Sequence, residues 1–329
     1  MHRERILKTD DQKMLFNLEL DIFFSVISVK ELKNKIATFQ VKKGDQSPEN
    51  FWKSICISLP LEFSFISDSL KNFSFKKGGH LFRVRKLTDQ LREQISKGRI
   101  DESELWEPPI KYAYRGRINR ENESYLYVSE SNLDICVSEA RLTENDEFLL
   151  ISYEVLSPLD VVGIGFKSDL DTLEISSSTK KKMNILNTAI RKIFLKDSVN
   201  AYVYSNYIAN DLYNFRNGWA YPSVQSNKGK NICLKLSEKK KLKVHTLITG
   251  IYRPNDTCRY TFNKAFEIID DQQICYSYLN NEEKDSFLRV WHKTFIDPKL
   301  KKPNDESTAE EKSQLTVVDK LFFSRNNLI

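Results

Sequence analysis

One stretch of the sequence, residues 115–140, contains three side chains of kinds that could do chemistry together. Arg117 lies in the segment RGRIN, Tyr127 in YLYVS and Glu139 in DICVSEA. A guanidinium can bind phosphate oxygens through paired hydrogen bonds, and a carboxylate can stabilise positive charge that develops beside it. The local patterns predict a turn, a strand and a helix for these segments, so the three side chains would have to be brought together by folding.

The surrounding elements predict a mixed α+β domain over residues 76–254. Apolar residues alternate or run together in the segments expected to be strands, which are residues 80–85, 148–155, 160–166, 219–224, 231–236 and 244–252. A short helix or ordered loop is expected over residues 87–98. Two longer helices are expected over residues 178–195 and 198–215, the second ending at Asn217-Gly218, which is a typical helix stop.

Residues 1–75 predict a helical extension before this domain. One helix is expected from about Asp11 to Ser28 and a second from Val29 to about Phe39, followed by a third near residues 48–57. An apolar face is predicted for the first of these helices, made by Leu15, Leu18, Ile22 and Val26.

Residues 255–329 predict a C-terminal region of mixed character. A strand pair is expected within residues 258–279, a helix over residues 281–294, and a charged linker over residues 299–312 before an apolar tail. The tail at residues 315–329, or the N-terminal helices, would contact a regulator, because each has an apolar face without an obvious core of its own.

Composition limits the classes of protein that fit. A net charge of +6 over 329 residues would favour an anionic ligand. The sequence contains no nucleic-acid-binding signature, so we expect no direct nucleic-acid partner. The five cysteines are scattered without a CxxC pair, and the histidines lack ligand spacing, so no metal is predicted and a reducing compartment is favoured. No signal-like or membrane-spanning run is found, so we expect a soluble cytoplasmic protein without a membrane partner.

Five motifs in order resemble the RES domain, a family named for its Arg, Glu and Ser motifs. They are HLFRVR, RGRIN, YLYVS, DICVSEA and SNYIANDLYNFRNGWAYPSVQSNKGKNICLKL, which together span about residues 78–252. Ile118 stands where the family usually has an aromatic residue, and Cys136 where alanine is common. Both replacements are apolar.

The resemblance implies an ADP-ribosyltransferase-like α+β fold and an activity that degrades NAD. Members resemble toxins of toxin–antitoxin modules, paired with an Xre-type antitoxin. The implied reaction is cleavage of the nicotinamide–ribose bond by hydrolysis or phosphorolysis, so that the chain is a glycosidase or NAD phosphorylase with NAD as substrate and no cofactor. Whether the protein forms a homo-oligomer stays open.

The resemblance also assigns two arginines to the pyrophosphate of NAD. Arg117 and Arg83 match the family's arginine positions. Arg85 lies two residues after Arg83 and would share its strand face, so the two could exchange roles.

Three further residues receive roles from the same match. Glu139 would stabilise the ribosyl cation, and Tyr127 would contact nicotinamide or its ribose, with Tyr125 as an alternative on the same strand face. Ser223 would support the site by binding ribose or orienting the carboxylate. Two glutamates in the loop TENDE are competitors for the acidic role.

Two other functions remain open. The same fold and site would serve an ADP-ribosyltransferase that modifies a macromolecular acceptor. A non-enzymatic chain that binds RNA or a protein partner through basic residues is the third possibility, although the lysine runs at residues 180–182 and 239–241 are expected to be solvated.

Overall fold

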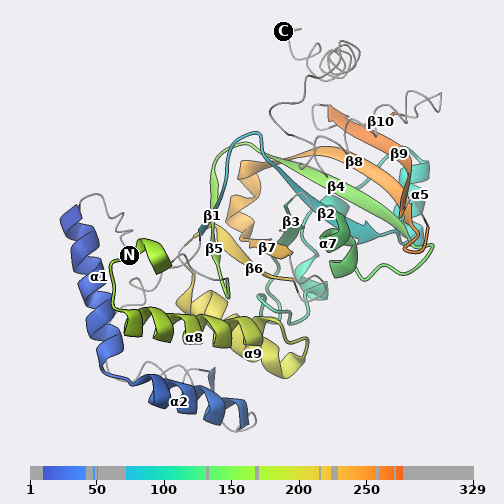
Figure 1. The fold of residues 1–329 in the computed structure, drawn as a ribbon. Helices are drawn as coiled ribbons and strands as arrows, with labels where there is room; N and C mark the ends of the chain where they lie inside the picture. Colours follow the sequence, from blue (N-terminus) through green and yellow to red (C-terminus); the bar gives the residue numbers. More distant parts are fainter. Residues whose placement is uncertain are drawn as a thin grey trace. The chain divides into compact units, whose positions relative to one another are not determined.

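The computed structural model describes residues 10–41, 47–48, 50, 72–130, 133–166, 170–214, 216–223, 229–256, 259–269 and 272–276. Helices and strands are mixed along the chain, which confirms the predicted α+β class (Figure 1). The chain divides into two compact units, each made of segments that are separate in the sequence. Unit 1 comprises the described parts of residues 1–77, 106–128 and 155–242, and unit 2 those of residues 78–105, 129–154 and 243–329.

Unit 1 contains a sheet whose strands follow the order β1-β5-β6-β7-β3. Its strands are β1 (Asn72–Phe75), β3 (Leu126–Ser129), β5 (Leu159–Gly163), β6 (Gly218–Pro222) and β7 (Lys230–Leu234). Strands β1 and β5 are antiparallel, as are β6 and β7, whereas β5 and β6 are parallel with Val162 opposite Trp219. A parallel pair needs a long connection, and the chain makes it through two helices.

These two helices are α8 (Ser177–Phe194) and α9 (Val199–Tyr207). Each begins at a serine whose hydroxyl accepts from a backbone N–H three residues later, which caps the helix. Helix α8 contacts α1 (Asp10–Ser25), α2 (Val29–Val41), α9 and β6 (Figure 1). Short helical turns complete the unit: η1 (Ile110–Tyr112), η2 (Leu170–Thr172), η3 (Ile208–Leu212) and η4 (Leu236–Lys241).

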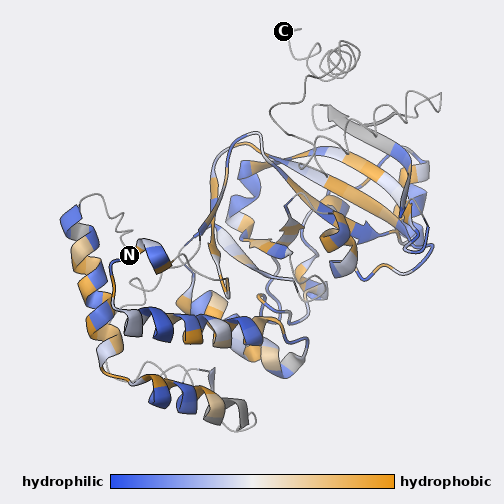
Figure 2. Ribbon diagram, viewed as in Figure 1, coloured by the Kyte–Doolittle hydropathy of each residue, from blue (hydrophilic) through white to orange (hydrophobic). Residues whose placement is uncertain are grey.

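The two N-terminal helices are confirmed, but the apolar face predicted for the first is the wrong one. Helix α1 buries Phe16, Leu20 and Phe24 in the core of unit 1, whereas Leu15, Leu18, Ile22 and Val26 are exposed. Apolar residues thus lie on two sides of α1, as the hydropathy colouring shows (Figure 2). Periodicity alone does not identify which of the two faces meets the rest of the fold.

One lysine of the run at residues 180–182 is also not solvated as predicted. Lys182 is buried, and its Nζ donates to the carbonyl oxygen of Phe24 at 2.5 Å. A cation is favoured near the C-terminus of a helix, where carbonyl groups lack partners, so Lys182 secures the end of α1. Asp21 of α1 accepts from the N–H and the hydroxyl of Ser176, at the start of α8.

Unit 2 contains a sheet in the order β2-β4-β8-β9-β10. Its strands are β2 (His80–Lys86), β4 (Glu147–Val155), β8 (Leu242–Tyr252), β9 (Tyr260–Ile269) and β10 (Gln272–Tyr276). Neighbours β2–β4, β8–β9 and β9–β10 are antiparallel. Residues 148–151 of β4 are fully buried, which confirms the central strand predicted from its continuous apolar run.

The helices of unit 2 are short. They are α5 (Asp89–Ser96), α6 (Glu102–Leu105) and α7 (Leu133–Glu139). Helix α5 agrees with the short helix predicted over residues 87–98, and β9 with β10 agrees with the predicted strand pair within residues 258–279. The helix predicted near residues 48–57 falls mostly outside the described residues. The helix predicted over residues 281–294, the charged linker and the apolar tail fall entirely outside them. Among the described helices, none is both long and apolar enough to cross a lipid bilayer.

Candidate functional site

The segment RGRIN forms a tight turn that closes on itself. The N–H of Gly116 donates to the carbonyl oxygen of Asn119 at 3.1 Å. A Cβ atom at position 116 would collide with the side-chain oxygen of Asn119, so the turn needs glycine there. The side-chain amide of Asn119 donates to the carbonyl oxygen of Tyr114 and accepts from the hydroxyl of Tyr127 at 2.7 Å. Asn119 therefore holds the turn on both sides.

Three polar side chains from the α9 region hold three consecutive carbonyl groups of this turn. Nδ2 of Asn206 donates to the oxygen of Gly116 at 2.7 Å, and Oγ of Ser205 to that of Arg117 at 2.6 Å. Nδ2 of Asn210 donates to the oxygen of Ile118 at 2.7 Å. Ser205 and Asn206 are buried, where bonds of this kind count most because water cannot replace them.

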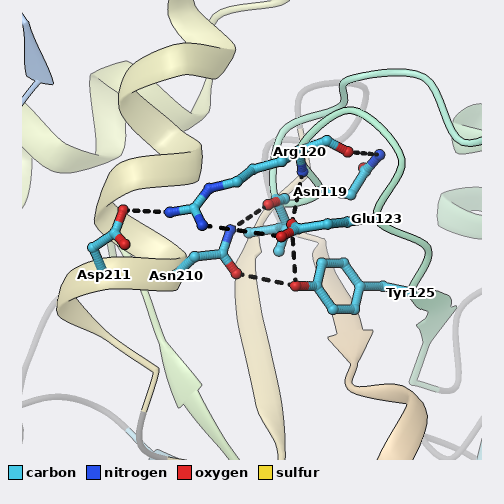
Figure 3. Close-up of polar contacts among 7 residues, drawn as sticks. Asn119, Arg120, Glu123, Tyr125, Asn210 and Asp211 are labelled. Atoms are coloured by element: carbon cyan, nitrogen blue, oxygen red, sulfur yellow. Dashed lines mark hydrogen bonds and ion pairs between the residues drawn. The ribbon is translucent and has the colours of Figure 1, made fainter.

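The third of these donors lies in a π-helical turn, η3, which continues α9. Such turns are rare and are often found at functional sites. Oδ1 of Asn210 also accepts from the hydroxyl of Tyr125 at 3.2 Å, and Tyr125 contacts Glu123 at 3.4 Å (Figure 3). Burial raises the pKa of Tyr125. Tyr125 is thus hydrogen-bonded to Asn210, one of the residues that hold the turn.

A second arginine, Arg120, takes part in the same network of polar contacts (Figure 3). Its Nη2 lies 2.6 Å from Asp211, while its backbone N–H donates to Glu123 at 3.0 Å. The hydrogen bond to Asp211 raises the pKa of Arg120 despite partial burial. Arg120 is therefore committed to a structural ion pair.

Arg117 differs from Arg120 in having few partners. Its side chain is only 10% exposed, and Nη2 faces Oδ1 of Asp197 at 3.4 Å, which is long for a charged pair. Nε is buried and finds no hydrogen-bond partner among the described residues. A largely desolvated guanidinium of this kind retains hydrogen-bonding capacity for an anion.

Two tyrosine rings lie beside the Arg117 guanidinium. Cζ of Arg117 is 5.6 Å from the centroid of the Tyr202 ring and 6.0 Å from that of Tyr221. Contacts of this kind are attractive for a cation and leave its N–H groups available. The hydroxyl of Tyr202 donates to Oδ1 of Asp197, so the carboxylate on Arg117 is itself held in place.

Tyr127 and Ser223, two of the predicted site residues, also lie in unit 1. The hydroxyl of Tyr127 donates to Asn119, and burial raises the pKa of Tyr127 well above its usual range. Ser223 directly follows β6, two residues after Tyr221; it is buried, and its N–H donates to Gly229 at 3.0 Å. The structure therefore places Arg117, Tyr127 and Ser223 in one unit, with Tyr127 linked to the turn that carries Arg117.

Unit 2 contains the other two predicted site residues and distinguishes Arg83 from its neighbour. Arg85 donates through Nη1 to the carbonyl oxygen of Glu104 at 2.5 Å and lies 2.9 Å from that residue's carboxylate. It serves as a brace between β2 and α6. Arg83 is partly buried on the same strand, opposite Ile151 of β4.

Glu139 is the last residue of α7 and is partly exposed. One turn earlier, the thiol of Cys136 donates to the carbonyl oxygen of Phe82 at 3.6 Å, which attaches α7 to β2 directly before Arg83. Burial, with a smaller effect from the charge of Glu139, raises the pKa of Cys136 to about 12. Of the competing glutamates, Glu147 lies 2.5 Å from Arg92. Glu144 is exposed.

The residues that sequence reasoning missed are those that position Arg117. Ser205, Asn206 and Asn210 occur in the segment SNYIANDLYN, where polar side chains interrupt an otherwise apolar helix. Buried polar residues must find partners, so this pattern is a signal for a loop held by a helix. Asp197 carries no comparable signal, because its contact depends on a residue 80 positions earlier.

Comparisons with known proteins add no relative. No protein-family model matches the chain. None of the curated proteins matches it. No solved structure matches it either. The resemblance to the RES domain and the roles that it implies for the predicted site residues stay predictions.

Proposed function

We propose that the chain is a RES-type enzyme that degrades NAD and binds the pyrophosphate of NAD at Arg117. The observation that carries the proposal is the state of Arg117, whose Nε is buried without a hydrogen-bond partner among the described residues and whose side chain is 10% exposed. Burying a cation is costly unless it is paired. A phosphate group would supply oxygens to both edges of the guanidinium.

The position of Arg117 supports binding by a rigid site. The guanidinium is carried by a turn whose three carbonyl groups are held by Ser205, Asn206 and Asn210. Little conformational freedom of the turn would be lost when a ligand binds, which favours affinity. The rings of Tyr202 and Tyr221 lie beside the guanidinium and support its position.

The proposed reaction breaks the bond between the nicotinamide nitrogen and C1′ of the ribose. The bonding electrons leave with nicotinamide, which departs as a neutral molecule and needs no general acid. A water oxygen bonds to this ribose carbon and a proton of the water passes to solvent, which yields ADP-ribose. Inorganic phosphate in place of water would yield ADP-ribose phosphorylated at the same carbon. The positive charge that develops on the ribose is of the kind that glycosidases stabilise with a carboxylate.

Glu139 is the carboxylate that we assign to this role, and Arg83 is assigned to the second phosphate contact. The choice follows the match to the RES motifs. The alternatives Arg85 and Glu147 form ion pairs with Glu104 and Arg92. Tyr127 donates its hydroxyl to Asn119, so its proposed contact with the nicotinamide ribose would be made by its ring. Ser223 supports the site from the end of β6.

The direct test is to incubate the purified chain with NAD and to follow free nicotinamide and ADP-ribose by chromatography, with and without phosphate. Arg117→Lys should raise KM, since a lysine cannot make the paired contact. Glu139→Gln should lower kcat. The matched controls are Arg115→Lys and Glu144→Gln, two exposed residues of the same types. No nicotinamide release by the wild-type chain, or equal losses in the controls, would remove the proposal.

A second activity on the same site is favoured by the segment before the turn. The side chains of Ile110, Tyr112 and Tyr114 are 57%, 58% and 80% exposed, next to the exposed Lys111 and Arg115. Exposed tyrosines with basic neighbours are common where a protein meets a macromolecule. This surface would suit ADP-ribosyl transfer to a macromolecular acceptor. With NAD labelled in its adenylate, transfer leaves label on macromolecules, whereas degradation leaves it in small products.

A further inference from the structure

Helix α1 has a second apolar face that the fold does not use. One face is buried in the core of unit 1 through Phe16, Leu20, Phe24 and the following Ile27. The other face consists of five side chains that are each between 51% and 67% exposed, namely Met14, Leu15, Leu18, Ile22 and Val26. These five residues, which we call the outer stripe, run from Met14 in α1 to Val26, the residue directly after the helix.

The outer stripe has the spacing of a helix that pairs with another helix. Leu15, Leu18 and Ile22 follow at intervals of three and four residues, the repeat that keeps side chains on one seam. Single exposed apolar residues are ordinary, but a continuous row of them marks an interaction surface. The charged ends of the helix show what kind of surface would cover it.

We propose that the outer stripe binds the same stripe of a second copy of this chain, with the two α1 helices antiparallel about a two-fold axis. When the helices are centred on position 20, Leu18 of one copy lies opposite Ile22 of the other, and Met14 opposite Val26. In this register Asp10 extends past Ser25, the last residue of the partner's α1, toward the start of its α2, where Lys30 lies. Four of the five stripe residues then meet an apolar residue, and Leu15 lies opposite Ser25. The pairing is the same seen from either copy, as a self-complementary interface requires.

Charge selects the antiparallel arrangement over the parallel one. Asp10, which pairs with Lys13 at 3.4 Å, and Asp11 are exposed at the start of α1, and Lys30 and Lys33 are exposed in the first part of α2. Antiparallel helices would bring acidic and basic ends together at both ends of the interface. Parallel helices would place the acidic ends side by side, and like charges at that distance are unfavourable.

The test measures the oligomeric state of the full chain by sedimentation velocity over a concentration series. The wild type should be a dimer. Leu18→Glu should raise the dimer dissociation constant by roughly 100-fold or more, because a charge would be buried between apolar side chains. The control is Ala37→Glu, which introduces the same charge at an exposed position of α2. Circular dichroism checks that each variant is folded.

Charge reversal tests the direction of the helices without touching the stripe. The pair Asp10→Lys with Asp11→Lys, and separately Lys30→Glu with Lys33→Glu, should each weaken the dimer by roughly three- to tenfold at low salt. All four changes together should restore it. A monomeric wild type, for example one in which another segment of the chain covers the stripe, overturns the proposal. So does a dimer that Leu18→Glu leaves intact, or one that the first reversal strengthens.

Discussion

Replacing Asp197 with asparagine is expected to strengthen the binding of a phosphate group at Arg117. In the structure the carboxylate of Asp197 occupies the anion position on Nη2 of Arg117 at 3.4 Å. An incoming phosphate must displace that negative charge or share the guanidinium with it. Asparagine keeps the shape and an oxygen acceptor but removes the charge. The phosphate would then bind the Arg117 guanidinium without competing against a carboxylate.

The size of the effect follows from the geometry of the pair. Two unit charges 3.4 Å apart attract by about 5 kcal/mol at an effective dielectric constant of about 20. That value is an upper bound, because the Asp197 side chain is 37% exposed and solvent screens it. A net competition of about 1 kcal/mol is expected, which corresponds to a roughly fivefold lower dissociation constant for the ligand.

Isothermal titration calorimetry with inorganic pyrophosphate, and separately with NAD, measures this difference. The matched control is Asp211→Asn, which makes the same change beside the neighbouring Arg120 and should leave the affinity unchanged. The reasoning is refuted if Asp197→Asn binds pyrophosphate no more tightly than the wild type. Equal gains in both variants would mean that only the net charge of the unit matters.

Three further predictions concern the scaffold and its response to acid. Gly116→Ala should destabilise the chain by about 1–3 kcal/mol in urea unfolding and weaken pyrophosphate binding, because the added Cβ would displace the Asn119 side chain that holds the turn; an unchanged midpoint would contradict this. Asn206→Ala should cost about 1–2 kcal/mol, because it leaves the carbonyl of Gly116 without its donor, whereas the exposed Asn184→Ala should be close to neutral. Burial, with a smaller effect from His245, lowers the pKa of His80 from 6.5 to about 4. As the pH falls, the His80 imidazole of the unfolded chain therefore takes up a proton before that of the folded chain. The contribution of His80 to the free energy of unfolding is complete above about pH 6.5 and should fall by about 2 kcal/mol between about pH 7 and about pH 5. His80→Gln should remove that part of the loss, and an identical pH profile in the variant would disprove the assignment.

Most elements could be predicted from the sequence because their patterns are local. The central strand β4 is a continuous apolar run, and α8 begins at a capping serine and buries one side. The buried face of α1 could not be predicted, since Leu18 and Leu20 belong to faces that are equally apolar in the sequence and only the contact with α8 decides between them.

Charged residues were harder to place than apolar ones, for a related reason. Whether Lys182 is solvated depends on a carbonyl group at the end of α1, 158 residues earlier in the sequence. Likewise, Arg83 and Arg85 are equivalent by strand periodicity, and the partner of Arg85, Glu104 of α6, lies 19 residues later in the sequence. Charges are placed by long-range partners, which a local pattern does not contain.

The position of Arg117 shows how a loop can present a cation without a strand or helix of its own. A buried loop is usually unfavourable, since its carbonyl groups lack partners. Here consecutive carbonyl groups receive donors from α9 and its π turn, and that leaves the guanidinium as the part of the turn with unused donors. The identity of the residue at 117 then sets the chemistry, while α9 sets its position, so substitutions in α9 should alter ligand binding without touching the ligand.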